Sequence, residues 1–168
     1  MPKILENVRE QLLAEAKRQI SDKGYAKTTI RSVAAACSLG VGTVYNYFPS
    51  KDMLIASFMT EDWKTCLSAV KTEGTAEEIL RGIYFALCDF SKSHSKLFSD
   101  RDAKNVFSAV FSEWHPVLRG QIAEIILPLC KNSENPLFLS EFIAESLLSW
   151  TMESKSFDEQ YNVLKKLL

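Results

Sequence analysis

The sequence predicts an all-α protein of about nine helices, and three of its features carry that prediction. Apolar residues recur three or four positions apart almost throughout, which is the spacing of a helix face. No segment combines alternating polarity with a hairpin turn, as neighbouring strands would need. The six glycines and five prolines are few, and they separate one apolar stripe from the next.

Three helices are expected in the first fifty residues. An apolar stripe over residues 4–20 predicts the first, and Gly24 suits the position that ends it. Thr28 or Thr29 can cap a short second helix, and Gly40 opens a third. The side chains expected to face inward from the two short helices are Ile30, Val33, Ala34, Val44 and Phe48.

Further helices are expected after Pro49. Ser50 can cap one that reaches Gly74, and Thr75 begins the next. Pro116 is expected to stop a helix, because its ring clashes in most helix interiors. The apolar stripes that mark the remaining helices cover residues 79–90, 106–114, 118–129, 137–150 and 157–168.

Composition and motif content disfavour several classes of protein. No apolar run approaches the roughly 20 residues of a membrane span, and Glu6 and Glu10 make the N-terminus unlike a secretory signal peptide. The four cysteines are far apart and form no CxxC pair, so we expect reduced core thiols, a cytoplasmic protein and no metal or cofactor. HExxH, GxSxG, paired carboxylates and Cys–His neighbours are missing, so a small enzyme or carrier is the least favoured interpretation.

Charge is divided unevenly along the chain of 168 residues. Residues 1–51 hold eight basic and four acidic side chains, whereas the remainder holds twelve basic and seventeen acidic ones. A basic head on an acidic body suits a head that meets phosphates and a body that does not. We therefore expect a domain at residues 1–50 that binds nucleic acid and a second domain at residues 51–168.

Residues 29–48, TIRSVAAACSLGVGTVYNYF, predict two short helices with a tight turn between them. A helix-turn-helix has this pattern, and its second helix presents N-terminal side chains to the major groove of DNA. Gly42 costs a short helix about 1 kcal/mol relative to alanine, a cost that close approach to a ligand surface would explain. The alternative is a plain helical hairpin in which Tyr45 and Tyr47 are packing residues.

The polar side chains of this segment suit contacts with DNA. Thr43 and Asn46 can reach base edges, and the phenol hydroxyls of Tyr45 and Tyr47 can donate to phosphates. On the flanks of the groove, the candidates for hydroxyl or charge contacts with phosphates are Thr28, Thr29 and Lys51.

Over about residues 3–60 the chain resembles the N-terminal domain of TetR-family transcriptional regulators. The matching elements are Thr28-Thr29-Ile30, Val33-Ala34, residues 42–48, Pro49-Ser50-Lys51 and Leu54. The resemblance implies a three-helix DNA-binding head on a helical body that binds a ligand and dimerises. Position by position, it implies a DNA-facing set of Val41, Gly42, Thr43, Tyr45, Asn46, Tyr47 and Lys51. Two positions depart from the family pattern, which commonly has glycine at Ser38 and serine at Gly40.

For the body, the resemblance implies an effector pocket between the central helices and a dimer face made by the last two. Numerous aromatic residues favour an apolar or aromatic effector. The pocket candidates are Phe85, Phe107, Phe111, Trp114 and Phe142. The stripe over residues 137–150 is too wide for packing on a single neighbour, which favours an interface. The dimer candidates are Leu137, Phe138, Leu148, Tyr161 and Leu164.

The expected function is therefore that of a ligand-responsive transcriptional repressor. It would bind a palindromic operator in double-stranded DNA as a homodimer and leave it when a small apolar or aromatic effector binds. The alternative is a regulator that binds DNA without an effector and keeps a vestigial pocket, because the chain is short for the family.

Overall fold

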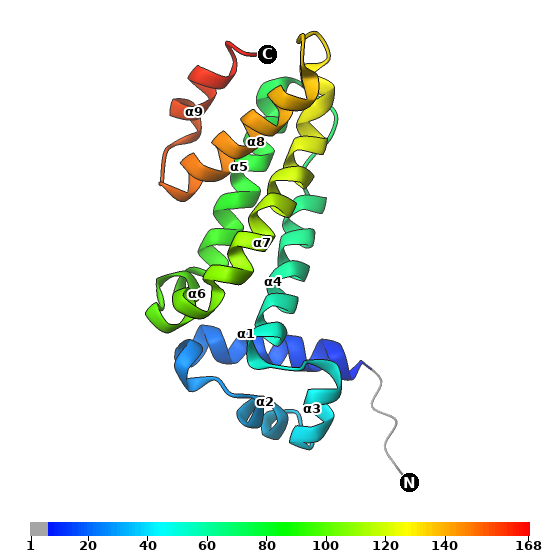
Figure 1. Cartoon of the computed structure of the whole chain (residues 1–168), viewed down its shortest axis with the longest axis vertical. Helices are drawn as coiled ribbons and strands as arrows, with labels where there is room; N and C mark the ends of the chain where they lie inside the picture. Colours follow the sequence, from blue (N-terminus) through cyan, green and yellow to red (C-terminus); the bar gives the residue numbers. More distant parts are fainter. Residues whose placement is uncertain (1–6) are drawn as a thin grey trace. The chain divides into compact units, whose positions relative to one another are not determined.

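The computed structural model describes residues 7–168, apart from the side chains of residues 105–113. Over this range every regular element is helical, as nine α-helices and one 3₁₀-helix, so the expected all-α architecture is confirmed (Figure 1). The elements, in chain order, are α1 (Val8–Lys27), α2 (Ile30–Ala36), α3 (Val41–Tyr47), α4 (Lys51–Ser68), α5 (Ala76–Ser93), α6 (Ser95–Ser99), α7 (Arg101–Ile126), η1 (Leu127–Cys130), α8 (Pro136–Met152) and α9 (Phe157–Leu164).

The helices group into two compact units. The head unit comprises the residues up to Asp62 together with His94–Val110, and the body unit comprises Trp63–Ser93 together with Phe111–Leu168. Helices α4 and α7 each give their first part to the head unit and their last part to the body unit. The functional division expected after residue 50 stays a prediction.

The head unit is built on the apolar face of α1, against which α2 and α6 pack. Helix α1 kinks at Gly24, where φ is 81° and ψ is 175°, and then resumes as far as Lys27. A positive φ favours glycine, which explains why the helix breaks at this position. The side chains fully buried in the head unit include Leu12, Ala16, Val33, Val44 and Leu54.

The body unit brings α5, α8 and α9 into contact, with η1 against α8. Trp63, 1% exposed, meets the ring of Phe90 edge-on with the centroids 5.5 Å apart. Its indole N–H donates to Oε1 of Gln121 at 2.8 Å. A buried indole needs such a partner, so this hydrogen bond lets a large apolar ring lie in the core without leaving a polar atom unpaired.

Pro116 does not stop a helix, so that sequence-based expectation is wrong. It lies inside α7, which is continuous from Arg101 to Ile126. A proline costs a helix interior about 3 kcal/mol, because it lacks an N–H and its ring crowds the preceding turn. Pro116 is exposed, whereas Leu118 and Ile122 beyond it are buried. Burial of these apolar side chains beyond Pro116 outweighs the local cost, since packing supplies most helix stability in proteins.

Helix α4 is shorter than expected and ends at Ser68, well before Gly74. The four residues 71–74 are all exposed, so a longer helix would bury nothing there. The next helix begins directly after Thr75, as expected, and Thr75 caps it: its hydroxyl accepts from the N–H of Glu78 at 3.2 Å, and the Glu78 carboxylate accepts from the N–H of Thr75 at 2.8 Å. The hydroxyl of Ser50 likewise accepts a hydrogen bond near the start of α4.

Candidate nucleic-acid interface

Helices α2 and α3 pack together as the sequence predicts for a helix-turn-helix (Figure 1). Every side chain expected to face inward is buried, with exposed fractions of 7% or less. These side chains are Ile30, Val33, Ala34, Val44 and Phe48. The two short helices are therefore fixed by their apolar sides, and α3 leaves its other side exposed.

The turn between α2 and α3 is closed by backbone hydrogen bonds around Ser38. The N–H of Ser38 donates to the carbonyl of Ala35 at 3.1 Å, and that of Leu39 donates to the carbonyl of Ala34 at 2.8 Å. This pairing defines a Schellman motif, whose central residue adopts left-handed backbone angles. Ser38 has a φ of 56°, whereas Gly40 has an ordinary φ of −69°. Serine therefore replaces the usual glycine at the position where the backbone is left-handed. A serine in that conformation costs about 1 kcal/mol relative to glycine.

The start of α2 is held by a capping box and by α1. The hydroxyl of Thr29 accepts from the N–H of Ser32 at 3.0 Å, and the hydroxyl of Ser32 accepts from the N–H of Thr29 at 3.0 Å. Gln19, 3% exposed on α1, donates from Nε2 to the carbonyl of Ser32 and accepts from its hydroxyl. Sequence reasoning missed Gln19, although a polar residue three positions after Ala16 on an apolar stripe was a usable signal.

The two threonines before α2 differ in accessibility. Thr28 is 1% exposed, and its hydroxyl donates to the carbonyl of Gly24 at 2.9 Å. Thr29 is exposed, with its hydroxyl engaged in the capping box. The structure therefore leaves Thr29 on the surface and places the Thr28 side chain inside the head unit.

Most of the expected recognition residues lie on the outer side of α3. Tyr45 is 51% exposed and Tyr47 is 46% exposed, and Gly42 and Asn46 are exposed as well. Val41 and Thr43 are half-buried. A side chain built at Gly42 would meet nothing within 4 Å, so packing inside the chain gives no reason for glycine there.

Lys51, expected beside DNA, is occupied within the head unit. Its ammonium donates to the backbone carbonyl of Tyr25 at 2.8 Å and lies 3.5 Å from the centroid of the Tyr25 ring. The Tyr25 hydroxyl in turn donates to Oδ1 of Asp52 at 2.7 Å. Burial lowers the pKa of Lys51, although nearby Asp52 opposes that shift. These contacts tie the start of α4 to the end of α1.

The expected pocket residues do not all come together. Phe85 on α5 is 53% exposed, and the half-buried Trp114 ring lies 5.8 Å from that of Phe90. Phe142 on α8 stacks on Phe138, with centroids 6.5 Å apart. The side chains of the two other pocket candidates, Phe107 and Phe111, lie outside the described residues.

The expected dimer residues divide between surface and core. Leu137 and Phe138 on α8 are each 67% exposed. Leu148 and Leu164 are buried within the body unit, and Tyr161 is half-buried and stacks on Phe157. The exposed apolar face of α8 therefore comprises Leu137, Phe138 and Phe142.

Two general properties of the described part of the chain bear on function. No cluster of three or more histidine, cysteine, aspartate or glutamate side chains suited to a metal ion occurs among the residues described. In the same part of the chain, no helix is long and apolar enough to cross a bilayer.

Comparison with known proteins gives matches to bacterial transcriptional regulators. Residues 12–58 match the profile of bacterial regulatory proteins of the tetR family. An HTH-type transcriptional repressor of Mycobacterium tuberculosis is 31% identical over 78 residues, which are 44% of this chain and 42% of that protein. The chain spans less than half the length of the curated relatives it matches, with shares of 24% to 42%.

Two solved structures share the fold over nearly the whole chain. A TetR-family transcriptional regulator from Pectobacterium atrosepticum superposes with a TM-score of 0.63 at 21% identity, covering 95% of this chain and 91% of that one. FadR of Thermus thermophilus, a TetR-family repressor in complex with lauroyl-CoA, superposes with a TM-score of 0.61 at 21% identity, covering 95% and 92%.

Proposed function

The chain belongs to the TetR family of bacterial regulatory proteins, and from that premise we propose that it is a transcriptional repressor that binds double-stranded DNA through α3. The observation that carries the proposal is the exposed side of α3, where Tyr45, Asn46 and Tyr47 lie together with Gly42, a glycine that no internal contact explains. A glycine that costs helix stability without relieving any internal contact suits a backbone that must approach another molecule closely.

Each expected recognition residue of α3 has a role in this proposal. Thr43 and Asn46 read base edges, and the hydroxyls of Tyr45 and Tyr47 donate to phosphates. Gly42 leaves room for the DNA backbone or groove wall to approach α3 closely, and Val41 lies beside it at the start of the helix. Thr29 supports a phosphate contact from the exposed start of α2.

The repressor acts as a two-fold dimer on a palindromic operator. The exposed face formed by Leu137, Phe138 and Phe142 supports this part of the proposal, because clustered exposed apolar side chains mark interaction surfaces. Leu148 and Leu164 are buried within the body unit and do not belong to that face. Two copies would place their α3 helices in successive major grooves, about 34–36 Å apart.

A small apolar or aromatic effector releases the repressor by favouring a dimer whose recognition helices no longer match that spacing. The lauroyl-CoA held by the Thermus thermophilus repressor has a long apolar chain, which supports a search among effectors with a large apolar part. The alternative is an effector-independent regulator. Thermal unfolding with a panel of apolar and aromatic compounds distinguishes the effector-released repressor from the effector-independent regulator. A ligand that binds the native state raises Tm as its concentration increases.

The experiment that tests DNA binding compares two glycine-to-alanine substitutions, each of which adds a single methyl group. A duplex selected from a randomised library by the wild-type protein serves as the operator, and affinity is measured by fluorescence anisotropy. Gly42→Ala should weaken binding at least about tenfold, although alanine stabilises a helix by up to about 1 kcal/mol. Gly120→Ala is the control, because it also lies in a helix with open space for a Cβ. Equal affinities of the two variants would contradict the docking of α3.

A further inference from the structure

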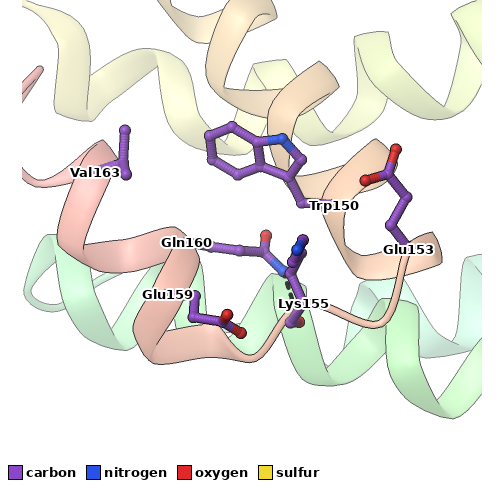
Figure 2. A pocket seen from close by; sticks show the side chains of 6 residues that line it. All are labelled: Trp150, Glu153, Lys155, Glu159, Gln160 and Val163. Atoms are coloured by element: carbon purple, nitrogen blue, oxygen red, sulfur yellow. Dashed lines mark hydrogen bonds between the residues drawn. The ribbon is translucent and has the colours of Figure 1, made fainter.

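A hollow in the body unit lies between the end of α8 and α9. Its volume is about 250 Å³, somewhat smaller than the range of about 300–1,000 Å³ that holds drug-sized ligands. The residues that line it are Trp150, Glu153, Lys155, Glu159, Gln160 and Val163 (Figure 2). None of these residues belongs to the candidate DNA-binding or effector sites.

Gln160 is the polar side chain at the floor of this hollow, and it is 1% exposed. Its amide nitrogen donates to the hydroxyl of Thr151 at 3.2 Å and to the carbonyl of Lys155 at 3.1 Å. The second acceptor cannot donate, so the nitrogen is fixed on that side of the amide. The amide oxygen is left buried without a hydrogen-bond partner among the described residues.

The direction in which this oxygen points determines which group of a ligand could bind it. Figure 2 shows it on the side of the amide that faces Trp150, with the nitrogen turned toward Lys155. Buried acceptors in native proteins nearly always have a donor, so each exception calls for an explanation. This oxygen has almost no accessible surface, so a molecule with an N–H or O–H group completes the arrangement by lying against the half-buried Trp150 ring and displacing that ring slightly.

The charges around the hollow favour a cation. Glu153 and Lys155 are exposed at its rim and offset each other. The Glu159 carboxylate accepts from the N–H and the hydroxyl of Ser156 at 2.8 Å each, and these bonds hold its pKa below the ordinary value. Two carboxylates against one ammonium leave net negative charge, and an indole face attracts cations.

We propose that this hollow binds a small organic monocation that carries N–H donors and a flat apolar part. One N–H donates to Oε1 of Gln160, the flat part lies on Trp150, and the charge is offset by Glu153 and Glu159. The proposal does not rest on DNA binding, because none of its residues lies on α2 or α3.

The test uses the full chain, labelled with ¹⁵N, and a matched series of probes. Benzamidinium carries both the charge and the N–H donors, benzamide lacks the charge, and phenyltrimethylammonium lacks the N–H donors. We expect benzamidinium to shift the indole signal of Trp150 and the side-chain amide of Gln160, with a Kd in the low-millimolar range for so small a ligand. The two other probes should each bind about fivefold or more weakly.

Two variants connect the binding to these residues. Glu153→Gln should weaken benzamidinium about threefold and leave benzamide unchanged, whereas Glu134→Gln, an exposed change outside the hollow, should alter neither. Gln160→Met should abolish the preference for benzamidinium over phenyltrimethylammonium. If that variant does not fold, the relative affinities of the three probes for the wild-type chain still test the proposal. Equal affinities of all probes, or no shift at Trp150 and Gln160, would overturn the proposal.

Discussion

The ammonium of Lys51 lies 2.8 Å from the carbonyl oxygen of Tyr25 and 3.5 Å from the centroid of the ring of the same residue. One side chain thus joins the start of α4 to the end of α1 by a hydrogen bond and a cation–π contact. The same lysine was expected from sequence to contact a phosphate. The two roles make different predictions for the salt dependence of DNA binding.

Lys51→Ala should destabilise the protein by about 1–2 kcal/mol, from the loss of the hydrogen bond and the cation–π contact. It should weaken operator binding without changing the slope of log K against log salt, because the ammonium is already engaged within the protein. Chemical unfolding and anisotropy titrations at several salt concentrations measure both quantities. A slope smaller by about one with unchanged stability would instead mean that Lys51 neutralises a phosphate.

Ser38→Gly should stabilise the protein by about 0.5–1 kcal/mol, since glycine adopts the left-handed angles of this turn without a Cβ penalty. Ser154→Gly is a matched change, because Ser154 has a φ of 63° in the body unit. Both variants should raise Tm, and neither should weaken operator binding. An unchanged Tm in Ser38→Gly would mean that the serine relieves its own strain in the turn.

Phe138→Glu should shift the mass of the protein in solution from dimer to monomer. The side chain is 67% exposed on the apolar face of α8, and a carboxylate buried in an interface without a partner is strongly unfavourable. Phe85→Glu is the control, because Phe85 is a similarly exposed aromatic residue, at 53%, on α5. Light scattering over a concentration series measures the mass. A wild-type mass that stays monomeric at every concentration would refute the dimer itself.

Glu159→Gln should lower Tm at neutral pH but not in strong acid. Hydrogen bonds from the backbone and hydroxyl of Ser156 lower the pKa of Glu159 from its ordinary value of 4.5. A lowered folded-state pKa gives stability that is present above the unfolded value and is lost as pH falls through the folded value. The Tm difference between wild type and variant should therefore shrink below about pH 4.5. A difference that is constant from neutral pH into acid would exclude a contribution from the charge.

The sequence predicted most of the helices, the inward face of α2 and α3, a cap at Thr28 or Thr29, the cap at Ser50 and the start of a helix at Thr75, because spacing and local hydrogen bonding determine these features. It did not predict the short helix α6, which has no apolar stripe of its own. It did not predict the continuity of α7 through Pro116. That outcome depends on a proline that faces solvent while Leu118 and Ile122 beyond it are buried, which spacing alone does not show. The length of α4 was also misjudged, because the buried Val70 continues the apolar spacing although it lies beyond the end of the helix at Ser68.

The candidate sites were predictable to different degrees. The exposed side of α3 follows from helical spacing once Val44 and Phe48 are assigned inward. The partner of Lys51 is 26 residues away and required the fold. The stacking of Phe142 on Phe138 could have been expected from their spacing of four, yet an apolar residue on a wide stripe can face a pocket or a partner equally well.

The buried amide of Gln19 has a consequence for how α2 is oriented. Apolar contacts through Val33 and Ala34 alone would tolerate small rotations of α2 about its axis, because such contacts are not directional. The two hydrogen bonds between Gln19 and Ser32 can form together in only one of those rotations. A single amide thereby selects one orientation of α2, and through the turn at Ser38 it fixes the direction in which α3 presents Asn46 and Tyr45.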